Sequence, residues 1–344
     1  MVGIEDVAKY AGVSTATVSR ALSGKDHVSD KARDRVNKAA KELGYVASSS
    51  AYTLATGRNR NIGVVLPLID RWFFSTVLEA VETVFIEHGY DMTLYNLSGG
   101  EAQRAKVFSD FLLRKRVDAV LTIAVRLSED ELARLQQTRK PYLGIGGILP
   151  GASTLAINDF EAGKIATQHL INLGHTRIGT IGGDIGTDKE FAQPWHRHEG
   201  YMEALEEAGL RFEPHWFHVA DYTIPGAYHA AKQILGHPTD APTALFCTSD
   251  EMGFGAILAA KDLGLRVPDD ISIVGVDNHD LSGFFGLTTI NQEVRAQAQH
   301  AALELLSQLE HHVEGTPEKE DRFEVWPTTL LIRNSTARRP AEAR

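Results

Sequence analysis

The first 45 residues contain three segments whose apolar residues recur at helical spacing. In the first segment Ile4, Val7, Ala8 and Ala11 are three or four residues apart, so they fall on one face of a helix. Gly12 follows at once, and glycine permits the tight turn that a second helix needs. The pattern therefore predicts a short amphipathic helix that ends in a sharp turn.

A second and a third helix are predicted after that turn. Ser14 suits the N-cap of the second helix, and Ser29 suits the N-cap of a third helix that runs to about Leu43. Gly44 suits the position just past its end. The inward residues of the second helix are Val13, Val18, Ala21 and Leu22. Its outward residues are Thr15, Ala16, Ser19 and Arg20.

From residue 61 onward the pattern changes to short apolar runs that alternate with longer helical segments. A buried strand is predicted at 62–67, a helix at 74–88 and another strand at 91–95. Strands are also predicted at 117–124, 141–145, 177–181, 243–248 and 271–276. This alternation predicts mostly parallel sheets with helices on both faces. Ligands of such folds bind beyond the carboxyl ends of the strands.

Length and charge support a division into a small head and a larger body. A chain of 344 residues is too long for one ordinary core. Its net charge is −10, but residues 1–60 carry 10 Lys and Arg against 6 Asp and Glu, which gives +4. The other 284 residues therefore carry −14. A basic head on an acidic body suits a module that contacts phosphates, joined to a body that does not touch DNA.

Composition narrows the class of protein further. The single cysteine, Cys247, excludes an internal disulfide framework and cysteine-rich metal sites. The N-terminus lacks a signal-peptide pattern, and no apolar run reaches the roughly 18 residues of a membrane span, so we expect a cytoplasmic protein with no membrane partner. The glycine-rich runs at 144–147 and 182–183 lack the Lys and Ser or Thr of a phosphate loop. With no catalytic triad or paired carboxylates either, we expect neither an enzyme nor a metal or cofactor site.

The head predicts a helix-turn-helix module, with a three-helix bundle that does not bind nucleic acid as the alternative. Arg20 can donate two hydrogen bonds to guanine, and its short neighbours let the helix approach the bases. The motif extends over Asp6-Val7-Ala8-x-x-Ala11-Gly12-Val13-Ser14-x-x-Thr17-Val18-Ser19-Arg20. With it, the head resembles that of the LacI/GalR family of bacterial transcription repressors.

The resemblance continues through the hinge and the body. It includes Gly44-Tyr45-Val46, the hinge segment 50–58, Leu173-Gly174-His175-Thr176-Arg177, Arg197-x-x-Gly200-Tyr201, Val267-Pro268-Asp269-Asp270 and Pro327-Thr328-Thr329-Leu330. The chain departs from the family pattern at several positions. Gly3 replaces a capping Thr, Tyr45-Val46-Ala47-Ser48 replaces Tyr-x-Pro-Asn, Tyr52 replaces an Arg, and Gly144-Ile145-Gly146-Gly147 stands where relatives have an Asp. A secreted solute-binding protein with the same body is the competing interpretation, and the head argues against it.

The resemblance implies the following architecture. Residues 1–46 form an all-α helix-turn-helix DNA-binding head, residues 47–60 a hinge helix, and residues 61–336 an α/β body of two Rossmann-like lobes of the type I periplasmic-binding-protein kind. The N-lobe comprises about 61–157 and 292–324, and the C-lobe about 158–291 and 325–336. Residues 337–344 form a tail without a leucine heptad, which favours a dimer over a tetramer.

The resemblance also implies which residues touch DNA. Leu54 matches the hinge leucine that wedges into the minor groove, where an apolar wedge unstacks a base step. A wedge of this kind needs a second copy, so we expect a homodimer on a near-palindromic double-stranded operator. The predicted DNA-binding residues are Ser14, Thr15, Ala16, Thr17, Ser19, Arg20, Tyr45, Ala51 and Leu54.

A small-molecule effector is expected in the cleft between the lobes. Arg197 is expected to donate to hydroxyls or a carboxylate, Asp277 to accept from hydroxyls, and the aromatic residues to stack on a sugar. We expect Phe74 to be a core residue and Asp250 to cap a helix. The predicted effector-binding residues are Trp72, Phe73, Gln193, Arg197, Tyr222, Ser249 and Asp277.

The sequence therefore predicts a repressor whose operator affinity a small molecule controls. A sugar is the favoured effector, and Trp72 opposite the glycine run would suit a disaccharide. A purine, a nucleoside or a phosphorylated metabolite acting as corepressor is the alternative.

Overall fold

The computed structural model describes residues 2–22, 28–45, 57–114, 116–147, 149–184, 193–237, 239–311 and 322–339. The chain divides into two compact units. The head comprises Met1–Asn61 with Arg116–Asp118, and the body comprises Ile62–Lys115 with Ala119–Arg344. The hinge positions Ala51 and Leu54 lie outside the described residues, so their predicted roles stay predictions.

The head consists of the three predicted helices. They are α1 (Ile4–Ala11), α2 (Thr15–Leu22) and α3 (Asp30–Leu43). Val7, Val18 and Val36 are fully buried where the three helices meet. Gly12 and Gly44 have φ of 64° and 62°, a left-handed conformation that glycine adopts without steric cost.

The predicted helix caps of the head are also present. The Thr17 backbone N–H donates to Ser14 Oγ at 3.1 Å, and the Ala32 N–H donates to Ser29 Oγ at 3.4 Å. At the start of α1, where glycine replaces the usual Thr, the Gly3 N–H donates to the Asp6 carboxylate at 2.9 Å. An acidic group in the first turn therefore stabilises the helix that lacks a side-chain cap.

The N-lobe is built on a six-stranded sheet with the order β11-β5-β4-β3-β1-β2. The strands are β1 (Asn61–Leu66), β2 (Asp91–Asn96), β3 (Ala119–Ile123), β4 (Tyr142–Ile145), β5 (Ser153–Ile157) and β11 (Phe323–Trp326). The helices are α5 (Trp72–Glu87), α6 (Glu101–Lys106), α7 (Glu129–Gln137) and α13 (Val294–His311), with a π-helical turn at Val107–Phe111 and a 3₁₀ turn at Leu112–Arg114.

The C-lobe repeats this plan with the order β12-β10-β9-β8-β6-β7. The strands are β6 (Ile178–Gly182), β7 (Phe217–Val219), β8 (Ala244–Cys247), β9 (Ser272–Asp277), β10 (Thr288–Asn291) and β12 (Thr329–Leu331). The helices are α8 (Asp159–Asn172), α9 (Gln193–Glu207), α10 (Ile224–Leu235), α11 (Asp250–Asp262) and α12 (Ser282–Phe285), with a 3₁₀ turn at Pro214–Trp216. The edge strand β12 runs antiparallel to β10.

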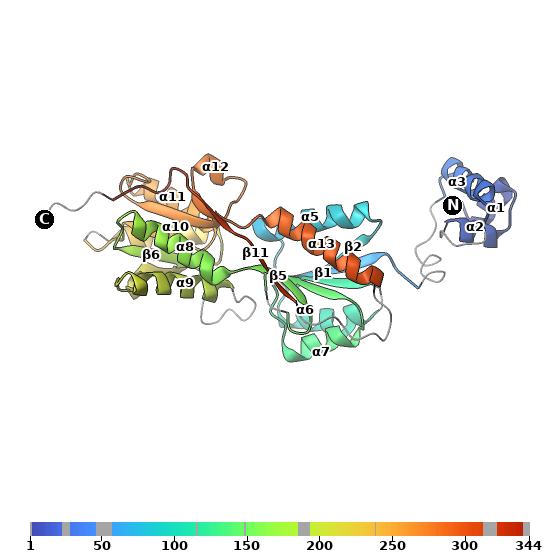
Figure 1. The fold of residues 1–344 in the computed structure, drawn as a ribbon, viewed down its shortest axis with the longest axis horizontal. Coiled ribbons are helices and arrows are strands. Elements are labelled where there is room, and N and C mark those ends of the chain that lie inside the picture. The colour runs from blue at the N-terminus through green and yellow to red at the C-terminus, as the bar shows by residue number, and fades with distance from the viewer. Residues whose placement is uncertain are drawn as a thin grey trace. The chain divides into compact units, whose positions relative to one another are not determined.

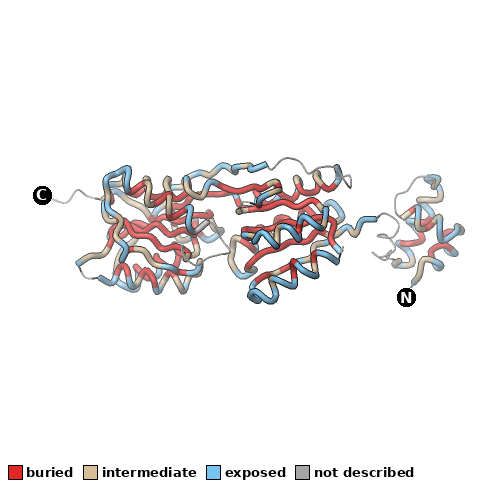
Figure 2. Tube along the Cα trace, turned by 90° about the horizontal axis from the view of Figure 1, so that it is seen from below, coloured by how far each residue is buried: buried red, intermediate tan, exposed pale blue. Residues whose placement is uncertain are grey.

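The strands of both lobes are largely buried, and the helices are exposed on their outer faces, as Figure 2 shows. Strand β3 is buried at every position, and so are β8 and β9. A continuous apolar run is typical of a strand covered on both faces. The prediction of parallel sheets with helices on both sides is confirmed.

The chain crosses between the lobes three times, after β5, after β10 and after β11 (Figure 1). The last crossing lies two residues later than the sequence predicts. β11 pairs with β5 through Trp326, opposite Ile157, so residues 325 and 326 belong to the N-lobe sheet. Within the described ranges, no helix is both long and apolar enough to cross a bilayer.

Candidate DNA-binding face and effector cleft

The leading face of α2 presents small and polar residues. Thr15, Ala16 and Arg20 are exposed, and Thr17 and Ser19 are half-buried. Ser14 is exposed, and its hydroxyl lies 2.9 Å from Thr17 Oγ1. The buried residues of α2, Val18 and Ala21, face the other two helices. This division leaves one helix face open to a DNA groove.

Tyr45 has a different setting from the α2 residues. It follows α3, its N–H donates to the Ala40 carbonyl at 2.8 Å, and its side chain is half-buried against the head core. Tyr45 therefore helps to hold the end of α3, whatever its contact with DNA.

The body contains a cavity of about 390 Å³ between the carboxyl ends of the two sheets. Its volume is within the usual range for small-molecule sites. Apolar and small residues dominate the N-lobe contribution: Leu68, Phe73, Phe74, Ala124, Gly146 and Ile157. Polar residues dominate the C-lobe contribution: Asp159, Asp184, Arg197, Asp221, Tyr222, Ser249, Glu251 and Asp277.

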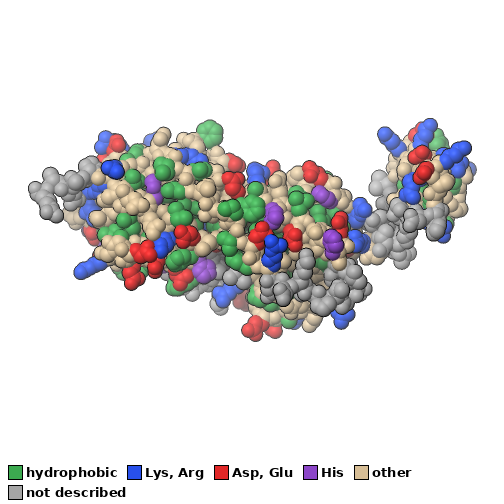
Figure 3. All heavy atoms as spheres, viewed as in Figure 1, with side chains coloured by type: hydrophobic (Ala, Val, Ile, Leu, Met, Phe, Trp, Pro, Cys, Tyr) green, Lys and Arg blue, Asp and Glu red, His purple; other side chains and the backbone are tan. Residues whose placement is uncertain are grey.

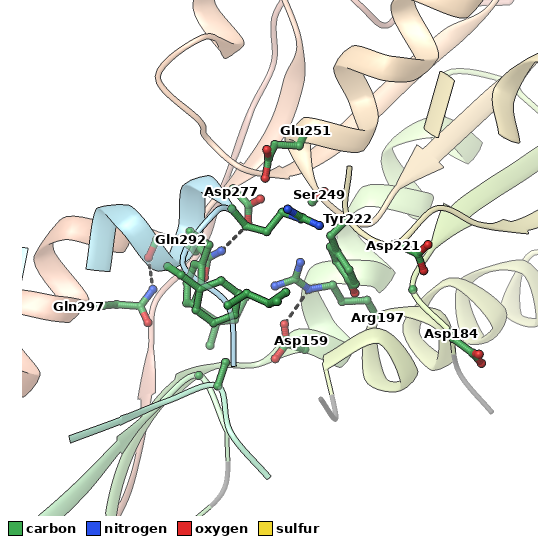
Figure 4. A pocket seen from close by; sticks show the side chains of 18 residues that line it. Asp159, Asp184, Arg197, Asp221, Tyr222, Ser249, Glu251, Asp277, Gln292 and Gln297 are labelled. Atoms are coloured by element: carbon green, nitrogen blue, oxygen red, sulfur yellow. Dashed lines mark hydrogen bonds and ion pairs between the residues drawn. The ribbon is translucent and has the colours of Figure 1, made fainter. Parts of the chain in front are cut away.

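Arg197 is held in place at the C-lobe side of the cavity. Its Nε donates to Asp159 Oδ1 at 2.8 Å, and its Nη1 donates to the Thr248 carbonyl at 2.5 Å (Figure 4). Burial acts to lower the pKa of Arg197, but the carboxylates of Asp159 and Asp277 outweigh it and raise that pKa. Burial also raises the pKa of the Asp159 carboxyl, against the effect of Arg197. Arg197 is thus a fixed cation in the wall.

The Arg-x-x-Gly pattern has a packing reason. A Cβ on Gly200 would lie 2.0 Å from the Phe160 carbonyl oxygen, and one on Gly163 would lie 2.1 Å from the Arg197 carbonyl oxygen. Only glycine at both positions lets α8 and α9 approach this closely. The close approach brings Arg197 on α9 within reach of Asp159 at the start of α8.

Asp277 ends β9 and lies in the cavity wall near Arg197. Its φ of 127° lies in a region that non-glycine residues rarely adopt, which indicates backbone strain. Gln292 Nε2 donates to Asp277 Oδ1 at 2.6 Å, and Gln297 donates in turn to the Gln292 carbonyl (Figure 4). Burial raises the pKa of Asp277 to about 8, with Arg197 opposing the rise.

Strained backbone recurs around the cavity. Ala124, Asp221 and Tyr222 have φ of 47°, 46° and 54°, although none of them is glycine. All three follow strands and line the cavity. Such conformations persist only where the surrounding structure enforces them, and they are found most often at ligand-binding and active sites.

Ser249 takes the capping role that the sequence assigns to Asp250. Ser249 is the N-cap of α11, with its Oγ accepting from the Met252 N–H at 3.3 Å, and it also lines the cavity. Asp250 does not cap the helix. It is fully buried and accepts from Thr289 Oγ1 at 2.6 Å and from Ser282 Oγ at 2.5 Å, which ties α11 to the segments around β10.

Phe74 is a core residue, as the sequence predicts, but it also lines the cavity beside Phe73, whereas Trp72 does not line it. Phe74 is 6% exposed and belongs to the N-lobe core, whereas Phe73 is half-buried, and both line the cavity. Trp72 is not among the lining residues. Its ring stacks on His279 with centroids 4.7 Å apart, and its Nε1 donates to Asp280 at 3.1 Å. Trp72 therefore offers no stacking surface for a disaccharide in this cavity.

Tyr222 lines the cavity as the sequence predicts, and the side chain of Gln193 lies outside what the structure describes. The polar and charged lining residues that sequence reasoning missed are Arg71, Asp159, Asp184, Asp221, Glu251, Gln292 and Gln297. The carboxyl ends of the strands gave a signal for Asp184 and Asp221. Nothing local marks the two glutamines, which reach the cavity only because the chain recrosses to the N-lobe after β10.

The cavity has an acidic lining. Two cationic residues, Arg71 and Arg197, face five acidic ones, Asp159, Asp184, Asp221, Glu251 and Asp277. Acceptors in excess of donors suit a ligand rich in hydroxyl or N–H donors, and they disfavour an anion.

Comparison with known proteins identifies the class of protein that this head and cleft define. Residues 3–48 match the model described as bacterial regulatory proteins, lacI family, and residues 167–336 match a periplasmic binding protein-like domain. The repressor CytR of Escherichia coli K12 is 35% identical over 341 residues, which covers 98% of this chain and 97% of CytR.

Two solved structures share the fold over nearly the whole chain. The lac repressor dimer bound to operator and the anti-inducer ONPF has a TM-score of 0.82 at 26% identity, covering 98% of this chain and 99% of its own. The complex of the regulator CelR with cellobiose has a TM-score of 0.70 at 28% identity, covering 97% and 100%.

The chain belongs to the lacI family of bacterial regulatory proteins. It is a DNA-binding repressor of that family with an effector-binding body, and the family consists of transcriptional regulators rather than enzymes.

Proposed function

We propose that two copies of this repressor bind a near-palindromic operator, and that a neutral, hydroxyl-rich small molecule in the cleft controls the operator affinity. The observation that carries this proposal is the acidic cavity, in which Arg197 and Asp277 are fixed beside an apolar wall. We expect a sugar or a compound that contains one, acting as an inducer.

The proposed DNA contacts come from the exposed face of α2. Arg20 would read a base edge, and Thr15 and Ala16 allow the helix to approach the groove. Ser14, Thr17, Ser19, Tyr45, Ala51 and Leu54 remain proposed DNA contacts. Each well-placed pair between a side chain and a base contributes about 1–3 kcal/mol of discrimination.

Exposed apolar residues on the C-lobe support a homodimer. Phe284 on α12 is 88% exposed and Leu281 is 43% exposed, and Figure 3 shows hydrophobic side chains uncovered over α12. Contiguous apolar patches are uncommon on monomers and mark interaction surfaces. The lac repressor, a structural relative, is a dimer on its operator.

A sugar effector suits the groups in the wall better than a phosphorylated one. Sugar hydroxyls can donate to Asp277 and Asp159 and accept from Arg197. A phosphate would add negative charge to a lining that already has five carboxyls against two guanidinium groups. The relative CelR binds cellobiose, which belongs to the same chemical class.

Binding would act through the equilibrium between arrangements of the two lobes. A coupling of about 1–3 kcal/mol changes operator affinity by roughly 5- to 150-fold. The cavity draws on both lobes, so a ligand there binds differently to open and closed arrangements, which is the condition for such coupling.

The test has two stages. DNA sites are selected from a random pool with the full-length protein, and we expect a two-fold symmetric sequence that Arg20→Ala binds at least tenfold more weakly. Lys41→Ala, an exposed cation at the end of α3, is the matched control. Thermal shifts are then measured with sugars, polyols, nucleosides and sugar phosphates, and each hit is added to the DNA complex. Tighter binding of sugar phosphates than of neutral sugars would contradict the proposed effector.

A further inference from the structure

Arg71 and Glu251 are two charged residues of the cavity lining that have no role in the sugar contacts described above. Arg71 lies in the loop before α5 in the N-lobe, and Glu251 is the second residue of α11 in the C-lobe. Figure 4 places Glu251 on the opposite side of the cavity from Asp159 and Arg197. The cavity therefore has two polar ends, and the aromatic ring of Phe73 belongs to the wall between the lobes.

Arg71 has a donor that its own surroundings leave unused. Its Nη1 lies 2.9 Å from Asp70 Oδ2 and donates to the Asp70 carbonyl at 3.3 Å. Its Nε is buried and has no hydrogen-bond partner within the described part of the chain. A buried charged donor without an acceptor costs free energy, which an acceptor atom on a ligand would recover.

Glu251 supplies the complementary acceptor. Its Oε2 accepts from the Trp72 N–H at 3.4 Å, so the side chain is held across the boundary between the lobes. Burial raises the pKa of Glu251, while the hydrogen bond from Trp72 and the charge of Arg71 oppose that rise. The carboxyl group stays a hydrogen-bond acceptor for a ligand N–H in its ionised form, and its second oxygen is free of the Trp72 bond.

The Arg71 donor and the Glu251 acceptor together match a ligand edge on which an acceptor atom stands next to an N–H. A ring that carries a carbonyl or ring nitrogen next to an N–H offers an acceptor to Arg71 and a donor to Glu251. Nucleobases have such edges, whereas a plain sugar presents hydroxyls, which are donor and acceptor at once and discriminate less.

We propose that Arg71 and Glu251 read the hydrogen-bonding edge of a base, so that the effector is a nucleoside whose ribose lies on the side of Arg197 and Asp159. This inference rests on the proposed function and narrows its ligand class. It assigns the N-lobe a specificity-determining charged residue in a wall that is otherwise apolar apart from Gln292 and Gln297.

Trp72 links the proposed base-binding residues to the contact between the two lobes. Its backbone holds Glu251, and its indole donates to Asp280 and stacks on His279 of the C-lobe. Asp280 also lies 3.8 Å from Arg295 Nη2 on α13. A ligand that binds Arg71 and Glu251 therefore contacts residues next to the Trp72 interactions that join α5 to the C-lobe.

The test uses ligand pairs that differ by one hydrogen bond. Calorimetry on the full-length protein measures ribose, cellobiose, uridine, inosine, and the N3-methyl and N1-methyl derivatives in which the ring N–H is lost. We expect a nucleoside to bind at least about tenfold more tightly than ribose, and its methyl derivative to lose about tenfold. The variants are Glu251→Gln and Arg71→Leu, with the exposed positions Glu310→Gln and Arg211→Leu as controls.

The variants separate recognition from folding. In Glu251→Gln, the loss of affinity caused by methylating the ring N–H should shrink severalfold, while the affinity for ribose changes less than about threefold. Arg71→Leu should lower the affinity for nucleosides and leave the affinity for ribose unchanged. Cellobiose binding without nucleoside binding would overturn this inference and leave the proposed sugar effector intact. Equal penalties in wild type and Glu251→Gln would also overturn it. No binding by any ligand would overturn both, and the DNA selection would still stand.

Discussion

The two walls of the effector cavity differ in kind. The N-lobe contributes apolar and small residues such as Leu68, Phe73 and Ala124, whereas the C-lobe contributes Arg197, Asp277 and most of the carboxyls. Hydrogen-bonding groups on the C-lobe fix the orientation of a ligand. The apolar surface of the N-lobe packs against the ligand without requiring one particular orientation. Substitutions at Arg197 and Asp277 of the C-lobe should therefore alter recognition most, and substitutions of apolar N-lobe residues should mainly weaken the packing of the wall against the ligand.

The largest expected effect comes from breaking the buried pair on the C-lobe. Arg197→Ala leaves Asp159 buried without its partner, which should lower the free energy of unfolding by about 3–5 kcal/mol and abolish the response to effector. Urea denaturation and DNA binding with and without effector measure both. Arg211→Ala, an exposed position, is the control.

A double variant separates stability from recognition at this pair. Arg197→Met with Asp159→Leu replaces both charges by apolar groups, so stability should return while effector binding stays lost. If the double variant still responds to effector, the C-lobe pair does not recognise it.

Substitution of Phe74 or Phe73 by Ala compares a core residue of the N-lobe with a half-buried residue of the cavity wall. Phe74→Ala creates a cavity in the core and should cost about 3–5 kcal/mol of stability. Phe73→Ala removes a half-buried ring, so stability should change little while effector affinity falls severalfold. Thermal unfolding and calorimetry on the two variants give the contrast. Equal loss of stability in both would contradict the division between core and cavity wall.

Asp277→Asn tests the acceptor on the C-lobe and has a defined dependence on pH. The substitution replaces one carboxyl oxygen, a hydrogen-bond acceptor, by an amide N–H donor, which should lower effector affinity about tenfold. Burial raises the pKa of Asp277 to about 8, above the ordinary 3.8, so the folded chain binds this proton more tightly than the unfolded chain does. The free energy of unfolding should therefore fall as pH rises from about 4 to 8.

The pH measurement compares denaturation curves of wild type and Asp277→Asn between pH 4 and 9. The variant should show a shallower fall. Asp250, whose pKa burial raises to about 7, contributes the same sign and remains in the variant. Parallel curves for the two proteins would show that Asp277 does not carry the raised pKa.

The smallest expected effect lies at the contact between the lobes. Trp72→Phe keeps a ring to stack on His279 but removes the indole N–H that donates to Asp280. We expect a loss of about 1 kcal/mol in stability and a change in effector affinity below about threefold. Trp195→Phe, an exposed tryptophan, serves as the control in the same fluorescence and calorimetric assays. A loss as large as that of Arg197→Ala would show that recognition does not rest with the C-lobe.

Much of the fold could be predicted because its signals are local. The spacing of Val7, Ala8 and Ala11, the caps Ser14 and Ser29, and the strands around Val120 and Val274 each express a preference within a few residues. Helical stripes and apolar strand runs bury the same face wherever the rest of the chain lies. These predictions are confirmed by the structure.

The cleft could be predicted only in part. Arg197, Asp277, Phe73, Tyr222 and Ser249 line the cavity, and the resemblance to the family supplied these positions rather than any local pattern. Trp72 is assigned to the cavity from the sequence because it is next to Phe73, and that inference is wrong. Residues 72 and 73 are adjacent in sequence, but the helix that starts there turns one toward the C-lobe loop and the other toward the cavity.

The sequence by itself determined the helices of the head, the alternation of strands and helices, and the basic head on an acidic body, because each depends on residues close together in the chain. Only the tertiary structure decided that Gln292 and Gln297 support Asp277, that Asp250 is a buried tie and Ser249 the cap, and that Arg71 and Glu251 share one cavity. The folded chain brings Gln292 to Asp277, Thr289 to Asp250, and Arg71 into the same cavity as Glu251. No preference of a short segment specifies which distant segment it will meet.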